Sequence, residues 1–175
     1  MSPLRADIQS NILKIRTEMK NSPIKYEYLE EMVAHQISTK QHTGPNTSTQ
    51  ALLWLNRALS VMSTFLRKLV SSDSATKYDT GASFVLAYDE MLAKHHNWMV
   101  QRLFKIGLKM VPLYSAFKQN MIDKRCWEAA QQSGDPDWED QIEKKMIGHA
   151  REYCGHMASV ASQIRQMYKT HNIDP

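Results

Sequence analysis

The sequence lacks the features that mark several large classes of protein. It has two cysteines, Cys126 and Cys154, too few for a disulfide framework. No stretch approaches the roughly eighteen uncharged apolar residues of a membrane-spanning helix, and residues 1–7 contain no apolar signal-peptide core. We therefore expect a soluble, cytoplasmic protein in a reducing compartment.

Motifs of known chemistry are also missing. The sequence contains no glycine-rich phosphate loop, no cysteine pair at zinc spacing and no Gly-x-Ser-x-Gly elbow. His149 and His156 are seven residues apart with Cys154 between them, but a zinc site needs further ligands at recognised spacings. His95 and His96 have no marked nucleophile to activate. The sequence thus predicts a protein that is not an enzyme, with no catalytic residue, cofactor or metal.

The charge balance is mildly basic. Lys and Arg number 22 against 18 Asp and Glu, which gives a net charge of +4 and a pI near 9.0. Such a charge suits an anionic membrane surface or a nucleic acid. No basic helix with base-reading residues stands out, so we expect no nucleic-acid partner. The length of 175 residues predicts a single domain over residues 1–175.

Apolar residues recur at helical spacing along most of the chain, and no strand pattern of comparable length is present. The sequence therefore predicts an all-α fold. The expected helices span residues 4–20, 26–36, 50–70, 82–94, 95–110, 115–132 and 137–170. Thr47, Ser48 or Thr49 is expected to cap the third of these.

The sequence predicts which residues of helices 50–70 and 137–170 face water and which face the interior. In the very apolar helix 50–70, a narrow polar strip is expected to face water: Asn56, Ser60, Ser63 and Arg67. In helix 137–170, large side chains define the expected inner face: Ile142, Met146, His149, Tyr153, Met157, Val160, Ile164 and Met167.

The first helix carries a polar stripe beside its apolar face. Asp7, Asn11 and Lys14 are spaced i, i+4 and i+7, so an acid, an amide and an amine share one side. The stripe borders the row of Ile8 and Ile12, which would anchor it by packing. Taken alone, the pattern fits either a solvated face or a ligand site.

The stretch 95–110 is expected to form one helix with two different sides. The inward side comprises His96, Val100, Leu103 and Gly107. The outward side comprises Trp98, Arg102, Lys105 and Lys109. A large aromatic side chain followed by cations suits contact with an anionic bilayer surface, although a basic stripe can also be merely solvated.

Three stretches, in this order and at these separations, resemble the glycolipid transfer protein family. They are ADIQSNILKI at residues 6–15, ALLWLNRAL at residues 51–59 and KHHNWMVQRLFKIGLKMVP at residues 94–112. The resemblance implies a two-layer helical sandwich with a lipid-chain pocket between the layers. It also implies a protein that moves glycosphingolipids between membranes without chemistry.

The resemblance assigns roles by position. It implies that the headgroup sugar is bound by Asp7, Asn11, Lys14 and, beneath the ring, Trp54. It implies that His96 holds the ceramide amide together with Asp7, and that Trp98 docks on the membrane. In the related branch that carries ceramide-1-phosphate, cations replace the Asn and the Trp, so Asn11 and Trp54 favour the sugar-headed branch.

Two alternatives stay open within this resemblance. One is a ceramide-1-phosphate carrier. The other is a glycolipid sensor that reports to an adaptor protein at membrane contacts without efficient transfer. The segment ahead of Asp7 is shorter than is usual in the family, and we therefore expect the chain pocket to be less well covered.

Overall fold

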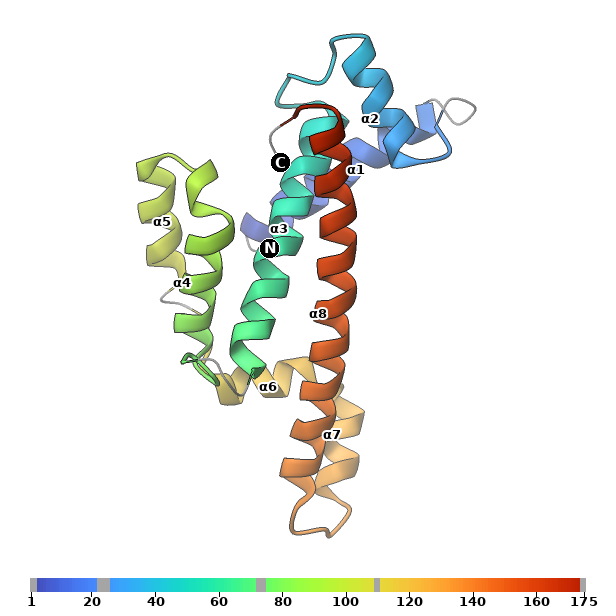
Figure 1. Ribbon diagram of the computed structural model, residues 1–175. Helices are drawn as coiled ribbons and strands as arrows, with labels where there is room; N and C mark the ends of the chain where they lie inside the picture. Colours follow the sequence, from blue (N-terminus) through green and yellow to red (C-terminus); the bar gives the residue numbers. More distant parts are fainter. Residues whose placement is uncertain (1–2, 22–25, 72–74, 109–110, 174–175) are drawn as a thin grey trace. The chain divides into compact units, whose positions relative to one another are not determined.

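Figure 1 shows the computed structural model of the chain, which describes residues 3–21, 26–71, 75–108 and 111–173. Every regular element in this described part is a helix, which confirms the predicted all-α class. The helices are α1 (Pro3–Asn21), α2 (Leu29–Ser38), α3 (Ser48–Val70), α4 (Thr80–Met91), the 3-10 helix η1 (Ala93–His95), α5 (Trp98–Leu108), α6 (Tyr114–Met121), α7 (Lys124–Gln131) and α8 (Trp138–Thr170). Within the described ranges, none of these helices has the length and apolarity needed to cross a membrane.

The chain divides into two compact units. Unit 1 comprises Met1–Ser60 with Ser159–Pro175, and unit 2 comprises Val61–Ala158. The long helices α3 and α8 continue from one unit into the other, whereas each remaining helix belongs to one unit. A single domain over residues 1–175 stays a prediction.

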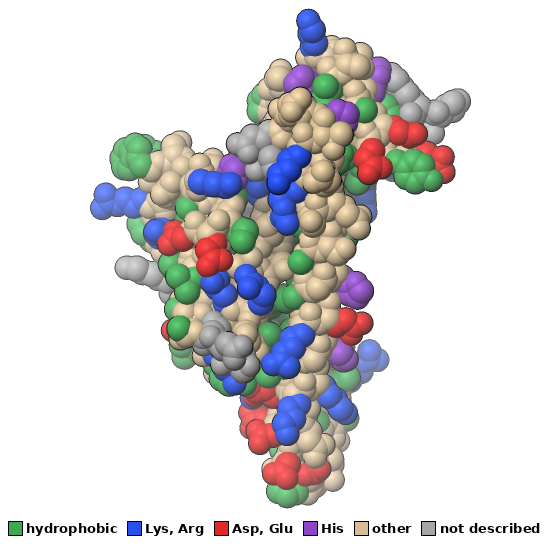
Figure 2. Space-filling model, in the orientation of Figure 1, with side chains coloured by type: hydrophobic (Ala, Val, Ile, Leu, Met, Phe, Trp, Pro, Cys, Tyr) green, Lys and Arg blue, Asp and Glu red, His purple; other side chains and the backbone are tan. Residues whose placement is uncertain are grey.

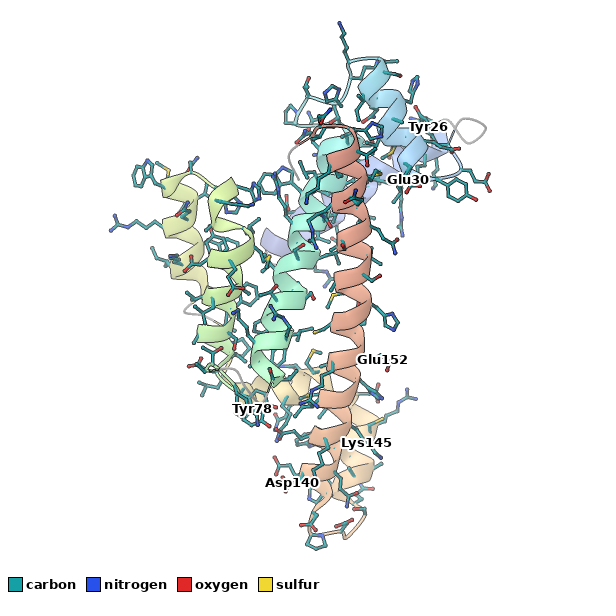
Figure 3. The ribbon with its side chains drawn as sticks, in the orientation of Figure 1. Tyr26, Glu30, Tyr78, Asp140, Lys145 and Glu152 are labelled. Carbon is teal, nitrogen blue, oxygen red and sulfur yellow. The ribbon has the colours of Figure 1, made fainter. Side chains whose placement is uncertain are left out.

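The core of unit 1 forms where α1, α2, the first half of α3 and the end of α8 meet (Figure 1). Met32 and Val33 of α2 are fully buried, as the apolar spacing of that helix predicts. Tyr26, which is labelled in Figure 3 and precedes α2, also belongs to this core. The buried members of the cluster are Ile15, Tyr26, Met32, Val33, Ala51, Leu52, Leu53 and Tyr168.

Polar side chains tie the same four helices together at the first turn of α3. The side-chain oxygen of Gln36 in α2 accepts hydrogen bonds from the backbone N–H and the hydroxyl of Thr49, at 3.0 and 2.7 Å. The hydroxyl of Tyr168 in α8 donates to the Thr49 carbonyl oxygen at 2.6 Å, and that of Ser48 donates to the Lys14 carbonyl oxygen in α1 at 3.3 Å. All four of these side chains are buried. We call Gln36, Ser48, Thr49 and Tyr168 the Thr49 junction.

The junction coincides with the N-terminus of α3, where backbone N–H groups need acceptors. The Thr47 hydroxyl accepts from the N–H of Gln50 at 3.2 Å, so Thr47 is the capping residue among the three predicted candidates. The same hydroxyl donates to the Gly44 carbonyl oxygen at 2.9 Å, which holds the loop ahead of α3 against the helix start.

Unit 2 is held together by an aromatic cluster and a charged one. The ring of Phe65 in α3 lies 4.8 Å from Phe84 in α4 and 5.6 Å from Phe117 in α6, measured between centroids. The buried ammonium of Lys118 in α6 pairs with the Glu139 and Glu143 carboxylates of α8 at 2.8 and 2.9 Å. These contacts fix α4 and α6 on the two long helices.

The pairing of α3 with α8 corrects the expected faces of both helices. Asn56 and Ser63 do not face water as predicted but are buried. Ser63 instead donates its hydroxyl to the carbonyl oxygen of Cys154 in α8 at 3.2 Å. On α8 the prediction was wrong for His149, Tyr153 and Val160, which are exposed. The buried stripe is Ile142, Met146, Ala150, Cys154, Met157, Ala161 and Tyr168.

Small side chains explain this shift of the buried face. Ala150, Cys154 and Ala161 are small and buried, and at Cys154 the Ser63 hydroxyl of α3 reaches the main-chain carbonyl oxygen of α8. Large residues at these positions would hold the helices apart. The larger Tyr153 and Val160 therefore lie on the outer side of α8.

Two expected helices are interrupted. The predicted helix 95–110 is wrong at its start, because His96 is extended, with φ −109° and ψ 141°, and α5 begins at Trp98. The Asn97 side chain caps α5 by accepting from the Val100 N–H at 3.0 Å. The predicted helix 115–132 is two helices, α6 and α7, because the Asp123 side chain accepts from the Arg125 N–H and starts a new helix.

We predict that Tyr168→Phe lowers the free energy of unfolding by about 1–2 kcal/mol, because the Thr49 junction loses a buried hydrogen bond. The measurement is chemical denaturation followed by circular dichroism. Tyr153→Phe is the matched control, since it removes an exposed hydroxyl from the same helix. Equal stability of the two variants would show that the hydroxyl of Tyr168 contributes nothing.

Candidate functional site

The polar stripe of α1 is a connected group on one side of the helix. The Asn11 side-chain amide donates to the Asp7 carboxylate at 3.3 Å, one turn away. Asn11 is 5% exposed, whereas Asp7 is exposed and Lys14 is half-buried. The Lys14 ammonium donates to the Pro45 carbonyl oxygen at 3.3 Å. A buried amide thus orients an accessible carboxylate, with a cation one turn further along the helix.

The Thr49 junction is bonded to the helix that carries this stripe. It binds the backbone of Lys14, and the loop that supplies Pro45 leads into the first turn of α3. Trp54 lies in α3, a turn and a half beyond Thr49 and within the same unit. Its indole is half-buried, and the Arg57 guanidinium lies over the ring, 4.7 Å from the centroid. Unit 1 therefore contains four of the predicted site residues.

His96 belongs to unit 2, in the extended segment between η1 and α5. Its Nδ1 lies 3.0 Å from the hydroxyl oxygen of Tyr88 in α4. Tyr88 is fully buried, and burial, with a smaller effect of the Asp89 charge, raises the pKa of its hydroxyl. The sequence analysis missed Tyr88, because its position carries no motif that marks a histidine partner. The predicted pairing of His96 with Asp7 stays a prediction.

Helix α5 exposes apolar and basic side chains together. Trp98 is 71% exposed, Leu103 63% and Ile106 56%. The outward position of Trp98 agrees with the predicted face, but Val100, Leu103 and Gly107 were expected on the inward side and are exposed. Figure 2 shows hydrophobic side chains next to Lys and Arg side chains over this helix. Lys109 lies outside the described residues.

A shallow hollow of about 370 Å³ lies on this surface, lined by Trp98, Gln101, Arg102, Lys105 and Ile106. Lys105 also forms an ion pair with Asp89 of α4 at 3.0 Å. On its other side α5 packs through Phe104, whose ring stacks on Tyr88 with the centroids 4.3 Å apart. The helix is thus attached along one edge and exposes the rest. Across the residues that the structure describes, no three His, Cys, Asp or Glu side chains are grouped to hold a metal ion.

Comparison with solved structures defines the class of fold. The structure described as showing how FAPP2 selects simple glycosphingolipids using the GLTP fold matches with a TM-score of 0.84 and 24% identity. That match covers 99% of this chain and 76% of that one. Human ceramide-1-phosphate transfer protein in complex with 12:0 ceramide-1-phosphate matches with a TM-score of 0.69 and 23% identity, over 97% and 76% of the two chains. The chain has the GLTP fold.

Sequence comparison identifies the family. The family described as Glycolipid transfer protein (GLTP) matches residues 1–123. A glycolipid transfer protein of Aureobasidium melanogenum is 31% identical over 124 residues, which are 71% of this chain and 58% of that protein. The one from Danio rerio is 27% identical over 179 residues, covering 99% and 78%. The chain belongs to the glycolipid transfer protein family, a family of lipid transfer proteins.

The lengths of the relatives differ widely. A Danio rerio pleckstrin homology domain-containing family A member 8 is 29% identical over 121 residues, but these are 21% of its length. The family therefore includes larger proteins in which a similar segment occurs beside other domains.

We predict that Trp98→Phe removes the tryptophan emission that acrylamide quenches most strongly. Trp98 is exposed, whereas Trp54, Trp127 and Trp138 are half-buried. The measurement is the quenching constant of each variant. Trp127→Phe, the control, should leave the quenchable fraction in place, and the opposite ranking would contradict the outward position of Trp98.

Proposed function

We propose that the chain binds a glycosphingolipid and carries it between membranes without chemical change. The observation that carries the proposal is the hydrogen-bonded Asn11 and Asp7 pair on α1, with Lys14 one turn further on. In this proposal these three side chains bind the headgroup sugar and Trp54 stacks on the sugar ring. His96 and Asp7 bind the amide of the ceramide.

The chemistry of these side chains suits a neutral polyol. A carboxylate accepts from sugar hydroxyls, an amide both donates and accepts, and an ammonium donates. Hydrogen bonds to charged groups contribute about 1.5–3 kcal/mol each, and an unpaired buried partner costs a similar amount. A ligand phosphate would instead meet the negative charge of Asp7 and the uncharged amide of Asn11. This favours a sugar over a phosphate headgroup.

Selectivity falls on the headgroup because the lipid chains contribute little net energy. Moving a chain from a bilayer into an apolar protein interior exchanges one apolar medium for another, so most of the ~0.8 kcal/mol per CH₂ cancels. The polar contacts then decide which lipid leaves the membrane. A change to one of the proposed headgroup-binding side chains should therefore alter lipid choice more than an equal change elsewhere.

In the proposed cycle α5 contacts the membrane. Trp98, Leu103 and Ile106 would enter the interfacial region, while Arg102 and Lys105 would lie near anionic headgroups. An exposed apolar patch of this kind on a helix is typical of an interaction surface. The proposed membrane-docking set also includes Lys109.

We predict that Asp7→Val slows transfer of fluorescent galactosylceramide between vesicles by about ten- to a hundred-fold, because one or more charge-assisted hydrogen bonds are lost. Circular dichroism should show an unchanged helix content. Glu152→Val is the matched control, because it removes an exposed carboxylate that projects from α8 (Figure 3).

The same assay separates the alternatives. Undiminished transfer by folded Asp7→Val would contradict the proposed headgroup site. Transfer of ceramide-1-phosphate without galactosylceramide, measured in parallel, would indicate the phosphate-carrying branch of the family. Binding of galactosylceramide without transfer would indicate a sensor or adaptor.

We also predict that Trp98→Ala weakens association with vesicles of phosphatidylcholine and phosphatidylserine by about ten-fold, since a large interfacial side chain is lost. Vesicle sedimentation measures this directly. Tyr153→Ala, which removes an exposed aromatic side chain from α8, should bind like the unmodified chain. Equal losses in both variants would argue against α5 as the docking surface.

A further inference from the structure

We infer that Tyr88 is a positioning residue that holds His96 in a single tautomer, with its proton on Nε2, so that His96 presents an N–H donor to the ligand. The role of this donor rests on the function proposed above, whereas the tautomer does not. The fully buried Tyr88 side chain on α4 is within hydrogen-bonding distance of the predicted amide-binding histidine.

The direction of the hydrogen bond follows from the surroundings of Tyr88. Its hydroxyl oxygen lies 3.0 Å from Nδ1 of His96. Among the described residues, this is the one hydrogen bond that the Tyr88 hydroxyl forms. If Nδ1 carried the proton, the buried O–H would have no acceptor, which costs free energy. The hydroxyl therefore donates to Nδ1, and a neutral His96 carries its proton on Nε2.

The surroundings also fix the position of the ring. The Tyr88 ring stacks on Phe104 of α5, with centroids 4.3 Å apart and planes inclined by 12°. The His96 ring lies 5.8 Å from Tyr88 and 6.1 Å from Phe104. The hydroxyl can rotate about its own bond, but the ring that carries it cannot move far. The tyrosine therefore provides a rigid donor aimed at Nδ1.

The main chain of His96 is fixed separately. The Gln101 side-chain amide donates to the carbonyl oxygens of Ala93 and His96, at 2.8 and 2.9 Å. This single side chain spans the non-helical segment between η1 and α5. Gln101 thus holds the backbone of His96, and Tyr88 holds its imidazole.

A fixed Nε2–H defines what His96 can recognise. It donates to a hydrogen-bond acceptor such as an amide carbonyl oxygen, and it cannot accept from an amide N–H while Nδ1 is occupied by Tyr88. An ionised carboxylate such as that of Asp7 can only accept a hydrogen bond, so it suits the amide N–H. An N-acylated sphingolipid offers the carbonyl oxygen, whereas its deacylated form, with a free amine, does not. Tyr88 would therefore support selection of N-acylated lipids.

The first experiment examines the tautomer without any lipid. Long-range ¹H–¹⁵N NMR of the imidazole groups at pH 8.5 distinguishes a protonated nitrogen from an unprotonated one. We expect the unmodified chain to show His96 with the proton on Nε2 and a hydrogen-bonded Nδ1. In Tyr88→Phe the Nδ1 signal should move toward that of a nitrogen without a partner. A proton on Nδ1 in the unmodified chain would overturn the inference.

The second experiment measures binding of two lipids, galactosylceramide and galactosylsphingosine, by Tyr88→Phe. We expect about a three- to ten-fold loss of affinity for the N-acylated lipid, the range for one neutral hydrogen bond, and no change for the deacylated one. Tyr114→Phe is the control, because it removes another unit 2 hydroxyl, one that donates to Glu143 at 2.9 Å. Equal losses for both lipids, or equal effects of both variants, would contradict a role in selection.

A third comparison tests whether Tyr88 acts through His96. In a His96→Ala background, Tyr88→Phe should cause no further loss of galactosylceramide affinity, because the imidazole that it positions is absent. Additive losses would contradict the inference. If the unmodified chain binds neither lipid, the proposed function fails, and the NMR result alone decides whether Tyr88 sets the tautomer.

Discussion

The arrangement of unit 1 depends on the hydrogen bonds of the Thr49 junction. Helices α1, α2, α3 and α8 come from distant parts of the sequence, and apolar packing specifies their register less strictly than directional hydrogen bonds do. The side chain of Gln36 and the hydroxyl of Tyr168 each need a partner because they are buried. A shift of α2, α3 or α8 would leave one of these two groups unpaired, and a shift of α1 would break the bond from Ser48 to the Lys14 carbonyl oxygen. The junction therefore determines where Lys14 and Trp54 lie.

The predicted recognition residues are supported by different means in the two units. On α1, successive turns of one helix supply the carboxylate, the amide and the ammonium, so helical geometry itself sets their spacing. His96 has no such support, because it lies between two helices and takes its position from Gln101 and Tyr88. The first arrangement can be recognised in a sequence from spacing. The second requires knowing which side chains of α4 and α5 meet.

Most of the fold could be predicted from periodicity, and the failures have physical causes. The α1 stripe and a cap at Thr47, Ser48 or Thr49 follow from local rules, whereas the hydrogen bond to the Gln50 N–H selects Thr47 among the three. The face of α8 was misjudged because large apolar residues such as Tyr153 and Val160 were weighted above Ala150 and Ala161. Close helix packing selects small residues, which periodicity of large side chains does not detect.

Other failures concern polar side chains. Ser63 is buried because a carbonyl oxygen of α8 accepts from it, and a sequence taken alone does not show that partner. The helix starts after Asn97 and Asp123 were missed although both are preferred N-cap residues, so capping preference carried information that apolar periodicity overrode.

The attachment of α5 has a consequence for local stability. A stacked ring and an ion pair to α4, with the Gln101 hydrogen bonds to Ala93 and His96, hold a helix that exposes Trp98, Leu103 and Ile106, and few buried contacts imply a low opening free energy. Its backbone amides should exchange hydrogen well before those of α3, and burial of its apolar side against any partner would slow that exchange.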